Sequence, residues 1–203
     1  MKKKISKDPY NPLDKMHLGE NVAKALLAQP ITDFPIQEPF TGAGIYALYY
    51  AGTFPIYRKI AEKNIRDRQI LPIYVGKAVP AGARKGGYGL GEAPGEVLYR
   101  RLREHAESIQ QAENLSLDDF KCRYLVVEDI WIPLGEALLI SMFSPLWNQL
   151  VDGFGNHDPG AGRYSQQRSA WDEIHPGRPW AKKLRPNSRS KEDTLKTILE
   201  FLG

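Results

Sequence analysis

Short apolar runs and longer amphipathic stretches follow one another along the chain and predict a mixture of strands and helices. The runs at 44–50 and 72–77 combine aromatic and β-branched residues with a Gly or Pro at one edge, and both are too short for a helix. They predict a pair of β-strands. Alternation of apolar and polar residues predicts a third strand over 120–127. Helical spacing of apolar residues predicts helices over 16–29, 96–106, 134–143 and 195–202.

The helix over 96–106 carries polar groups on the face that should turn inward. Leu98, Leu102 and Ile109 form one apolar stripe, and Arg101 and His105, one turn apart, fall on the same stripe. A guanidinium and an imidazole directed at the core cost desolvation free energy unless a partner satisfies them. A phosphate group would be such a partner.

The helix over 134–143 is apolar around its whole circumference, so we expect it to be buried. Glu136 is its only charged residue. A carboxylate inside such a helix is unfavourable unless a cation compensates it. Two alternatives follow, an ion pair with an arginine or a metal site, and the other polar groups of the predicted core favour the metal site.

Two tyrosines on the predicted strands, the Arg and His of the first core helix, and a Glu and an Asn downstream form a characteristic set. These residues are Tyr46, Tyr74, Arg101, His105, Glu136 and Asn148. In this order they resemble the GIY-YIG nuclease superfamily, from about Gly44 to Asn148. Two longer phrases, 73–82 and 151–163, resemble the type II restriction endonucleases of this fold that cut CCGCGG, and extend the resemblance to roughly Trp180.

The resemblance implies an α+β fold with a small central antiparallel sheet flanked by helices, inserted loops, and N- and C-terminal embellishments. We expect one domain over 1–203, with a catalytic core at about 40–150. Residues 1–39 would form an N-terminal arm and helix, and 151–203 a DNA-recognition loop and C-terminal extension.

The implied activity is hydrolysis of phosphodiester bonds in a palindromic double-stranded DNA site by a single-metal mechanism. Glu136 would hold one Mg²⁺, for which Mn²⁺ would substitute, and Arg101 would pair with the scissile phosphate. Tyr74 would orient water or phosphate, and Asn148 would hold the catalytic geometry or the phosphate. Tyr46 is the implied activator of the water, but a free phenol has a pKa of about 10, and His105 is better matched by its ordinary pKa. Both assignments stay open.

Glycine-rich and basic stretches supply the expected DNA contacts. The stretch 78–95 lacks the Gly-Lys-Ser/Thr ending of a phosphate-binding loop and the strand and helix context of a dinucleotide site, so no nucleotide cofactor is expected. Its glycines instead predict a loop close to a DNA backbone, and the polar loop 152–163 is assigned to DNA recognition. In the insert 51–71, helical spacing of Ile56, Ile60, Ala61 and Ile65 predicts a basic helix, which is either a further DNA contact or a solvated helical excursion. The candidate DNA-binding residues are Lys77, Arg84, Lys85, Asn156, His157 and Arg163.

Composition sets broad limits on the class of protein. The 203 residues carry a formal net charge of +4 and are 42% hydrophobic, and no apolar run approaches the roughly 18 residues of a membrane span. Cys122 is the only cysteine, which excludes an internal disulfide and a cysteine-based zinc site and fits a reducing cytoplasm. The resemblance to restriction endonucleases implies that this cytoplasm is bacterial. Lys2, Lys3 and Lys4 precede polar residues instead of an apolar segment, so no export is expected.

Cutting both strands of a palindrome asks for two active sites, so we expect a homodimer on DNA. One alternative is a repair or homing nuclease of the same superfamily, which is disfavoured because the chain has no room for a separate DNA-binding module. Another is a catalytically inactive DNA-binding protein of this fold, which would have no need of a buried Glu136. A third is a small nucleotide enzyme with a glycine-rich loop, which tight ATP binding without DNA would revive.

Overall fold

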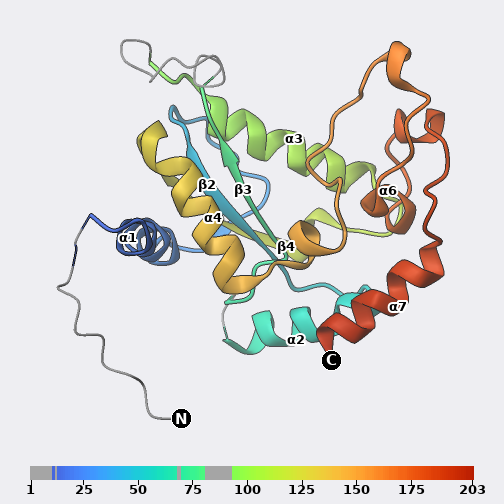
Figure 1. Cartoon of the computed structure of the whole chain (residues 1–203), viewed down its shortest axis with the longest axis horizontal. Coiled ribbons are helices and arrows are strands. Elements are labelled where there is room, and N and C mark those ends of the chain that lie inside the picture. The colour runs from blue at the N-terminus through green and yellow to red at the C-terminus, as the bar shows by residue number, and fades with distance from the viewer. Residues whose placement is uncertain (1–10, 12, 68–69, 81–92) are drawn as a thin grey trace.

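The computed structural model describes residue 11 and residues 13–67, 70–80 and 93–203. In these ranges a four-stranded antiparallel sheet with strand order β1-β4-β2-β3 is flanked by helices (Figure 1). The strands are β1 (Thr32–Asp33), β2 (Gly44–Tyr50), β3 (Tyr74–Ala78) and β4 (Phe120–Val126). The α-helices are α1 (Lys15–Leu27), α2 (Arg58–Asp67), α3 (Val97–Gln111), α4 (Ile132–Phe143), α5 (Leu146–Gln149), α6 (Ala170–Ile174) and α7 (Lys191–Leu202). Short 3₁₀ turns are η1 (Pro55–Tyr57), η3 (Leu117–Asp119), η4 (Asp129–Trp131), η5 (Ala161–Arg163) and η6 (Ala181–Lys183). The predicted α+β fold is confirmed.

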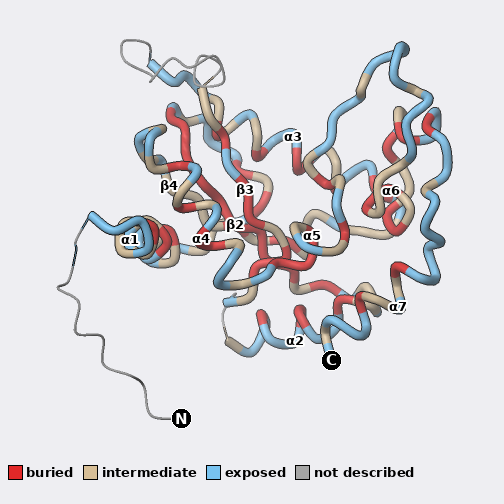
Figure 2. Tube along the Cα trace, viewed as in Figure 1, coloured by how far each residue is buried: buried red, intermediate tan, exposed pale blue. Residues whose placement is uncertain are grey.

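Strand β2 is buried along its whole length between β3 and β4. Its even-numbered side chains enter the core that α3 covers, and its odd-numbered side chains enter a second core against α1 and α4. Figure 2 shows the buried trace concentrated along β2 and β3 and on parts of the surrounding helices. Burial on both faces explains why 44–50 contains no charged residue.

Helices α3 and α4 lie on opposite faces of the sheet. The apolar stripe of α3 is buried as predicted. The expectation that α4 is buried all round is wrong, because Met142 is 53% exposed. The sheet and α1 cover only the inner side of α4, where a Cβ on Gly135 would lie 2.5 Å from Val22 Cγ1. Helix α4 ends at Phe143 and is capped by Ser144, in the left-handed region at φ 43°, and Pro145 follows.

The insert between β2 and β3 contains the basic helix α2, but its phase differs from the predicted one. Ile65, expected on the apolar face, is 65% exposed, and Asn64 is fully buried in its place. The Asn64 amide donates to Tyr50 O at 2.8 Å and to Leu71 O at 3.0 Å, and its Oδ1 accepts from Leu71 N at 2.9 Å. One side chain thus ties the two ends of the insert together.

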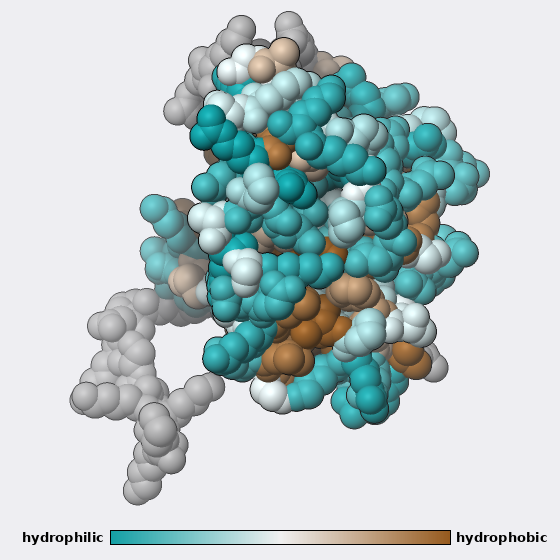
Figure 3. Space-filling view, turned by 90° about the vertical axis from the view of Figure 1, so that its right-hand side faces the viewer, coloured by the Kyte–Doolittle hydropathy of each residue, from teal (hydrophilic) through white to brown (hydrophobic). Residues whose placement is uncertain are grey.

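Helices α6 and α7 and the long loop before α6 form the right-hand side of the molecule in Figure 1. Figure 3 looks onto this side and shows a mostly hydrophilic surface with an apolar area in its lower half. Among the described residues, no helix has both the length and the apolar character that crossing a membrane requires. The side formed by α6, α7 and the loop before α6 is thus mostly polar.

Candidate active site

Two tyrosines on neighbouring strands point to the face of the sheet that α3 covers. The register pairs Tyr46 with Gly76 and Leu48 with Tyr74, so both tyrosines lie on the same face. A Cβ on Gly76 would lie 2.4 Å from the Tyr46 hydroxyl, so a glycine is needed there to admit the phenol. The tyrosine ring centroids are 6.2 Å apart, and each lies within 5.4 Å of the His105 ring centroid.

Tyr46 and His105 form a buried polar pair, with 2.5 Å between Tyr46 Oη and His105 Nε2. Burial raises the pKa of Tyr46 well above its ordinary value; Tyr74 adds to the rise and the Arg101 charge opposes it. Burial, followed by the Arg101 charge, lowers the pKa of His105 well below its ordinary value. At neutral pH the phenol therefore keeps its proton, and the imidazole is neutral and able to accept one.

Arg101 lies one turn before His105 on α3 and is held by three groups. Its Nη1 donates to Glu104 Oε2 at 3.0 Å and to His157 Nε2 at 2.5 Å. Its Nη2 donates to Gly155 O at 2.9 Å. These contacts fix a guanidinium whose planar donors suit a phosphate group.

Glu136 and Lys77 approach from the opposite face of the sheet. Because Lys77 pairs with Ile45 in the β2–β3 register, it lies on the side that α4 covers. Lys77 Nζ is 2.6 Å from Glu136 Oε2, and the two side chains are 40% and 18% exposed. Glu136 therefore forms an ion pair, the alternative to a metal site, but its partner is a lysine and not an arginine.

Asn148, on the short helix α5, lies against the edge of β3. The Asn148 Oδ1 accepts from Val75 N at 2.8 Å, and its Nδ2 donates to Val75 O at 2.8 Å. The amide thus bonds Val75 as a neighbouring strand would, and Val75 stands between Tyr74 and Gly76. Asn148 holds the strand that carries Tyr74.

An open hollow of about 640 Å³ collects groups from both faces of the sheet. Its lining includes Tyr74, Lys77, Arg101, Glu104, Glu136 and His157. Side chains from α3 and α4 can meet there because β3 ends the strand order, so both helices reach its outer edge. The buried Tyr46–His105 pair contacts Tyr74 from the interior.

The loop before α6 lines a second, smaller hollow of about 310 Å³. Asn156, His157 and Arg163 all contribute to its lining, and His157 lines the first hollow as well. The structure thus brings three of the candidate DNA-binding residues to one place beside the first hollow. Two others, Arg84 and Lys85, lie outside the described residues.

A family model of the Eco29kI GIY-YIG domain matches residues 38–202, which is most of the chain. The chain belongs to this family. The Eco29kI GIY-YIG family is one of restriction endonucleases, so the resemblance inferred from the residues is confirmed at that level. The matched range contains the six residues on which the resemblance rested. No curated protein gives a significant match to the chain.

Sequence reasoning missed the segment of the loop that supports Arg101 and His105. The Phe154 ring stacks on the His105 ring at a centroid distance of 4.4 Å and an interplanar angle of 14°. A Cβ on Gly155 would lie 2.9 Å from Arg101 Nη2 and 3.1 Å from Tyr74 Oη. The sequence signal for these contacts is Phe154 beside Gly155. The polar residues of the same loop predict only DNA recognition.

Proposed function

We propose that this protein is a type II restriction endonuclease that hydrolyses phosphodiester bonds in a palindromic site of double-stranded DNA. The observation that carries the proposal is the convergence of Arg101 and Glu136, from opposite faces of the sheet, on one hollow beside a buried Tyr–His pair. Phosphodiester hydrolysis needs a group that binds the phosphate, relief of negative charge, and a path for the proton of water. Membership of the Eco29kI GIY-YIG family supports the same activity.

The donor set around Glu136 fits a divalent cation that binds together with phosphate. In the described part of the chain no group of three or more His, Cys, Asp or Glu residues could hold a metal by itself. Mg²⁺ suits such a site, because it binds through one or two carboxylates plus substrate phosphate and keeps several waters. GIY-YIG nucleases are generally dependent on a divalent metal. When bound, the ion would neutralise charge on the phosphate and on the departing 3′ oxygen.

Glu136 is the proposed ligand because its partner Lys77 could move to a DNA phosphate, whereas Glu104, the other carboxylate in the hollow, is bonded to the Arg101 that would hold the scissile phosphate. One available carboxylate suits a single ion better than a two-metal clamp. Mg²⁺ is the proposed cofactor, and Mn²⁺, which accepts the same oxygen ligands, would substitute for it.

The protein's own groups supply phosphate binding and proton transfer. Arg101 would hold the scissile phosphate through charge-assisted hydrogen bonds, and Tyr74, which lines the hollow, would orient the attacking water. Tyr46 would take a proton from that water while passing its own proton to His105 Nε2, 2.5 Å away. The opposite pKa shifts of Tyr46 and His105 support this shared role, since the phenol is protonated and the imidazole is neutral at pH 7.

Lys77 would exchange partners when DNA and the metal bind. Its ammonium lies 2.6 Å from the Glu136 carboxylate, in the position of a compensating charge. A divalent ion on Glu136 would displace the ammonium, which would then be available to a DNA phosphate.

The DNA would run along the hollow and the loop that carries Asn156, His157 and Arg163. We expect a homodimer whose two-fold axis matches that of the palindrome, acting in a bacterial cytoplasm without a nucleotide cofactor. The proposed site is CCGCGG, whose guanines offer O6 and N7 in the major groove to Arg and Lys side chains.

Digestion of unmethylated plasmid DNA with Mg²⁺ tests the proposal, with fragment ends sequenced and an EDTA control. The wild type should yield discrete fragments that end at one palindrome. Glu136→Gln should retain specific DNA binding and lose cutting, whereas the matched control Glu113→Gln, whose carboxylate pairs with Lys182 at the surface, should cut normally.

Three outcomes would contradict the proposal, two of them in its activity and one in the role of Glu136. Specific binding without cutting by the wild type would indicate a non-catalytic DNA-binding protein. Cutting without one palindromic site would indicate a repair or homing nuclease. Normal cutting by Glu136→Gln would remove Glu136 from the metal site.

A further inference from the structure

One segment of the loop, residues 153–157, touches both parts of the site that α3 carries. Phe154 stacks on the His105 ring. The Gly155 carbonyl accepts from Arg101 Nη2, and His157 accepts from Arg101 Nη1. Since neither Arg101 nor His105 can shift without disturbing this segment, the segment's own anchor matters for the site.

That anchor is Arg178, which holds the same segment from within the core. Its Nη2 donates to Gly153 O at 2.9 Å, and its Nη1 donates to both Phe154 O and Asn156 O at 3.2 Å. The Gly155 carbonyl is the one that bonds Arg101 instead. Two arginines therefore hold successive carbonyls of one segment, Arg178 on the inner side and Arg101 at the hollow.

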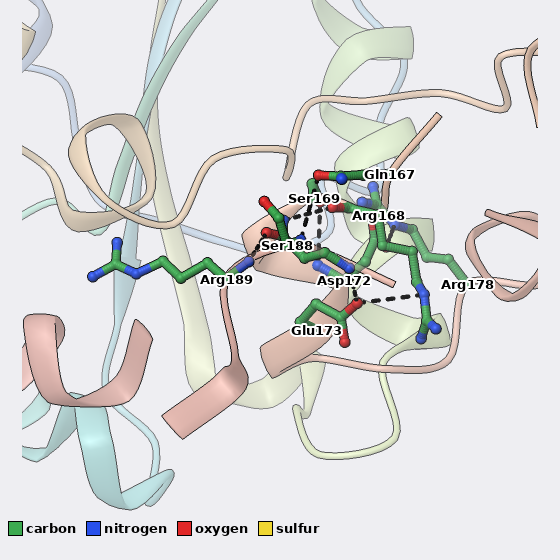
Figure 4. A network of polar contacts seen from close by, with 9 residues as sticks. Gln167, Arg168, Ser169, Asp172, Glu173, Arg178, Ser188 and Arg189 are labelled. Carbon is green, nitrogen blue, oxygen red and sulfur yellow. Dashed lines mark hydrogen bonds and ion pairs between the residues drawn. The ribbon is translucent and has the colours of Figure 1, made fainter. Parts of the chain in front are cut away.

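Arg178 is itself fixed by its surroundings. The Arg178 and Asp172 side chains are each 1% exposed and pair at 2.7 Å, from Nε to Oδ1. The guanidinium lies 4.5 Å from the ring centroids of Trp171 and Trp180. Ser169 donates to the second Asp172 oxygen at 2.7 Å, as part of the polar network around α6 in Figure 4.

From these contacts we infer that Arg178 is a positioning residue for the proposed endonuclease reaction, acting on Arg101 and His105 through residues 153–157. The inference rests on the proposed function. An arginine is required because three carbonyls and a carboxylate are bonded by one planar fork of donors, which a lysine ammonium cannot reproduce. Misplacement of a catalytic group by about 1 Å can lower a rate by about 10²-fold.

Three variants separate positioning from simple stability. Arg178→Lys keeps the charge but loses the fork, and Arg178→Met combined with Asp172→Asn removes both buried charges, so that no unpaired ion remains. Arg168→Met is the matched control, because Arg168 belongs to the same α6 network but pairs there with Glu173.

Two quantities should respond differently to these substitutions. They are the single-turnover rate of cutting, normalised to the folded fraction, and the affinity for DNA in EDTA. We expect both Arg178 variants to cut roughly 10- to 100-fold more slowly with affinity within about threefold of the wild type, and Arg178→Lys to be the less impaired. The Arg168→Met control should match the wild type. A normal rate per folded molecule in both Arg178 variants would overturn the inference.

A second readout does not depend on cutting. NMR signals of the His105 ring report its stacking on Phe154, and they should move in Arg178→Lys while those of His17, on α1, stay in place. Unchanged His105 signals would also overturn the inference. If the wild type itself fails to cut, the proposed function fails, and the His105 signals still decide whether Arg178 positions the ring.

Discussion

His175 should act as a buried acid-sensitive group, because a chain of hydrogen bonds requires it to be neutral. Trp147 Nε1, which can only donate, bonds Tyr57 Oη at 3.0 Å, so the Tyr57 proton points to His175 Nε2 at 2.6 Å. His175 Nδ1 therefore carries the ring proton and donates to Asn114 Oδ1 at 2.9 Å. A second ring proton would stand between Nε2 and the Tyr57 hydroxyl hydrogen and break the chain.

The size of the effect follows from the pKa of His175. Burial, with the Lys191 and Arg178 charges adding to it, lowers this pKa from 6.5 to about 3. The unfolded chain therefore binds the proton first, so the stabilisation is complete above pH 6.5 and is lost as pH falls from 6.5 toward about 3. At about 1.4 kcal/mol per pH unit, lowering the pH to about 4.5 should reduce the free energy of unfolding by about 3 kcal/mol.

Urea unfolding of the wild type and His175→Asn at about pH 7.5 and about pH 4.5 measures this difference. The variant keeps an amide but does not titrate, and His105, also buried with a lowered pKa, contributes to both proteins and cancels. The wild type should lose about 3 kcal/mol more than the variant. An equal loss in both proteins, or a His175 ring that titrates near its ordinary pKa by NMR, would refute the reasoning.

Three further substitutions test single contacts. Lys77→Met removes the ion pair of Glu136, so the Mg²⁺ concentration for half-maximal cutting should fall. The expected change is about threefold, because a partly exposed ion pair contributes under about 1 kcal/mol. An unchanged or higher Mg²⁺ requirement would contradict this. Gly155→Ala places a Cβ 2.9 Å from Arg101 Nη2, so single-turnover cutting should slow about tenfold at a near-normal melting temperature; a normal rate would show that Arg101 tolerates the shift. Asn64→Leu leaves the backbone groups at both ends of the insert unbonded and should cost about 3 kcal/mol in urea unfolding, whereas a loss under about 1 kcal/mol would mean that other groups replace the amide.

The tyrosine strands and α3 could be predicted because their signals are local. Alternation along a strand states which side chains share a face, and helical spacing does the same for Arg101 and His105. Their common burial next to Tyr46 follows once the two elements pack together. The placement of the two tyrosines, Arg101 and His105 can therefore be predicted from strand alternation and helical spacing alone.

The remainder depends on arrangement in space. Lys77 meets Glu136 because β3 lies at the end of the strand order, and no local pattern specifies that order. Asn64 replaced Ile65 on the inner side of α2 because three hydrogen bonds to the insert's ends outweighed one more apolar contact. Arg178 lies far along the chain from Arg101, and only the fold brings both to residues 153–157.

The edge position of β3 also bears on how the protein avoids association with itself. An outer strand offers unpaired backbone groups that can template pairing with another chain, and most proteins cover or shorten such edges. This edge borders the hollow, so a further strand laid along it would obstruct access to the site. Asn148 occupies both backbone groups of Val75, and the charged Lys77 follows two residues later. Asn148 thus holds the strand that carries Tyr74 and also keeps another chain from pairing with this edge, which must stay accessible because it borders the hollow.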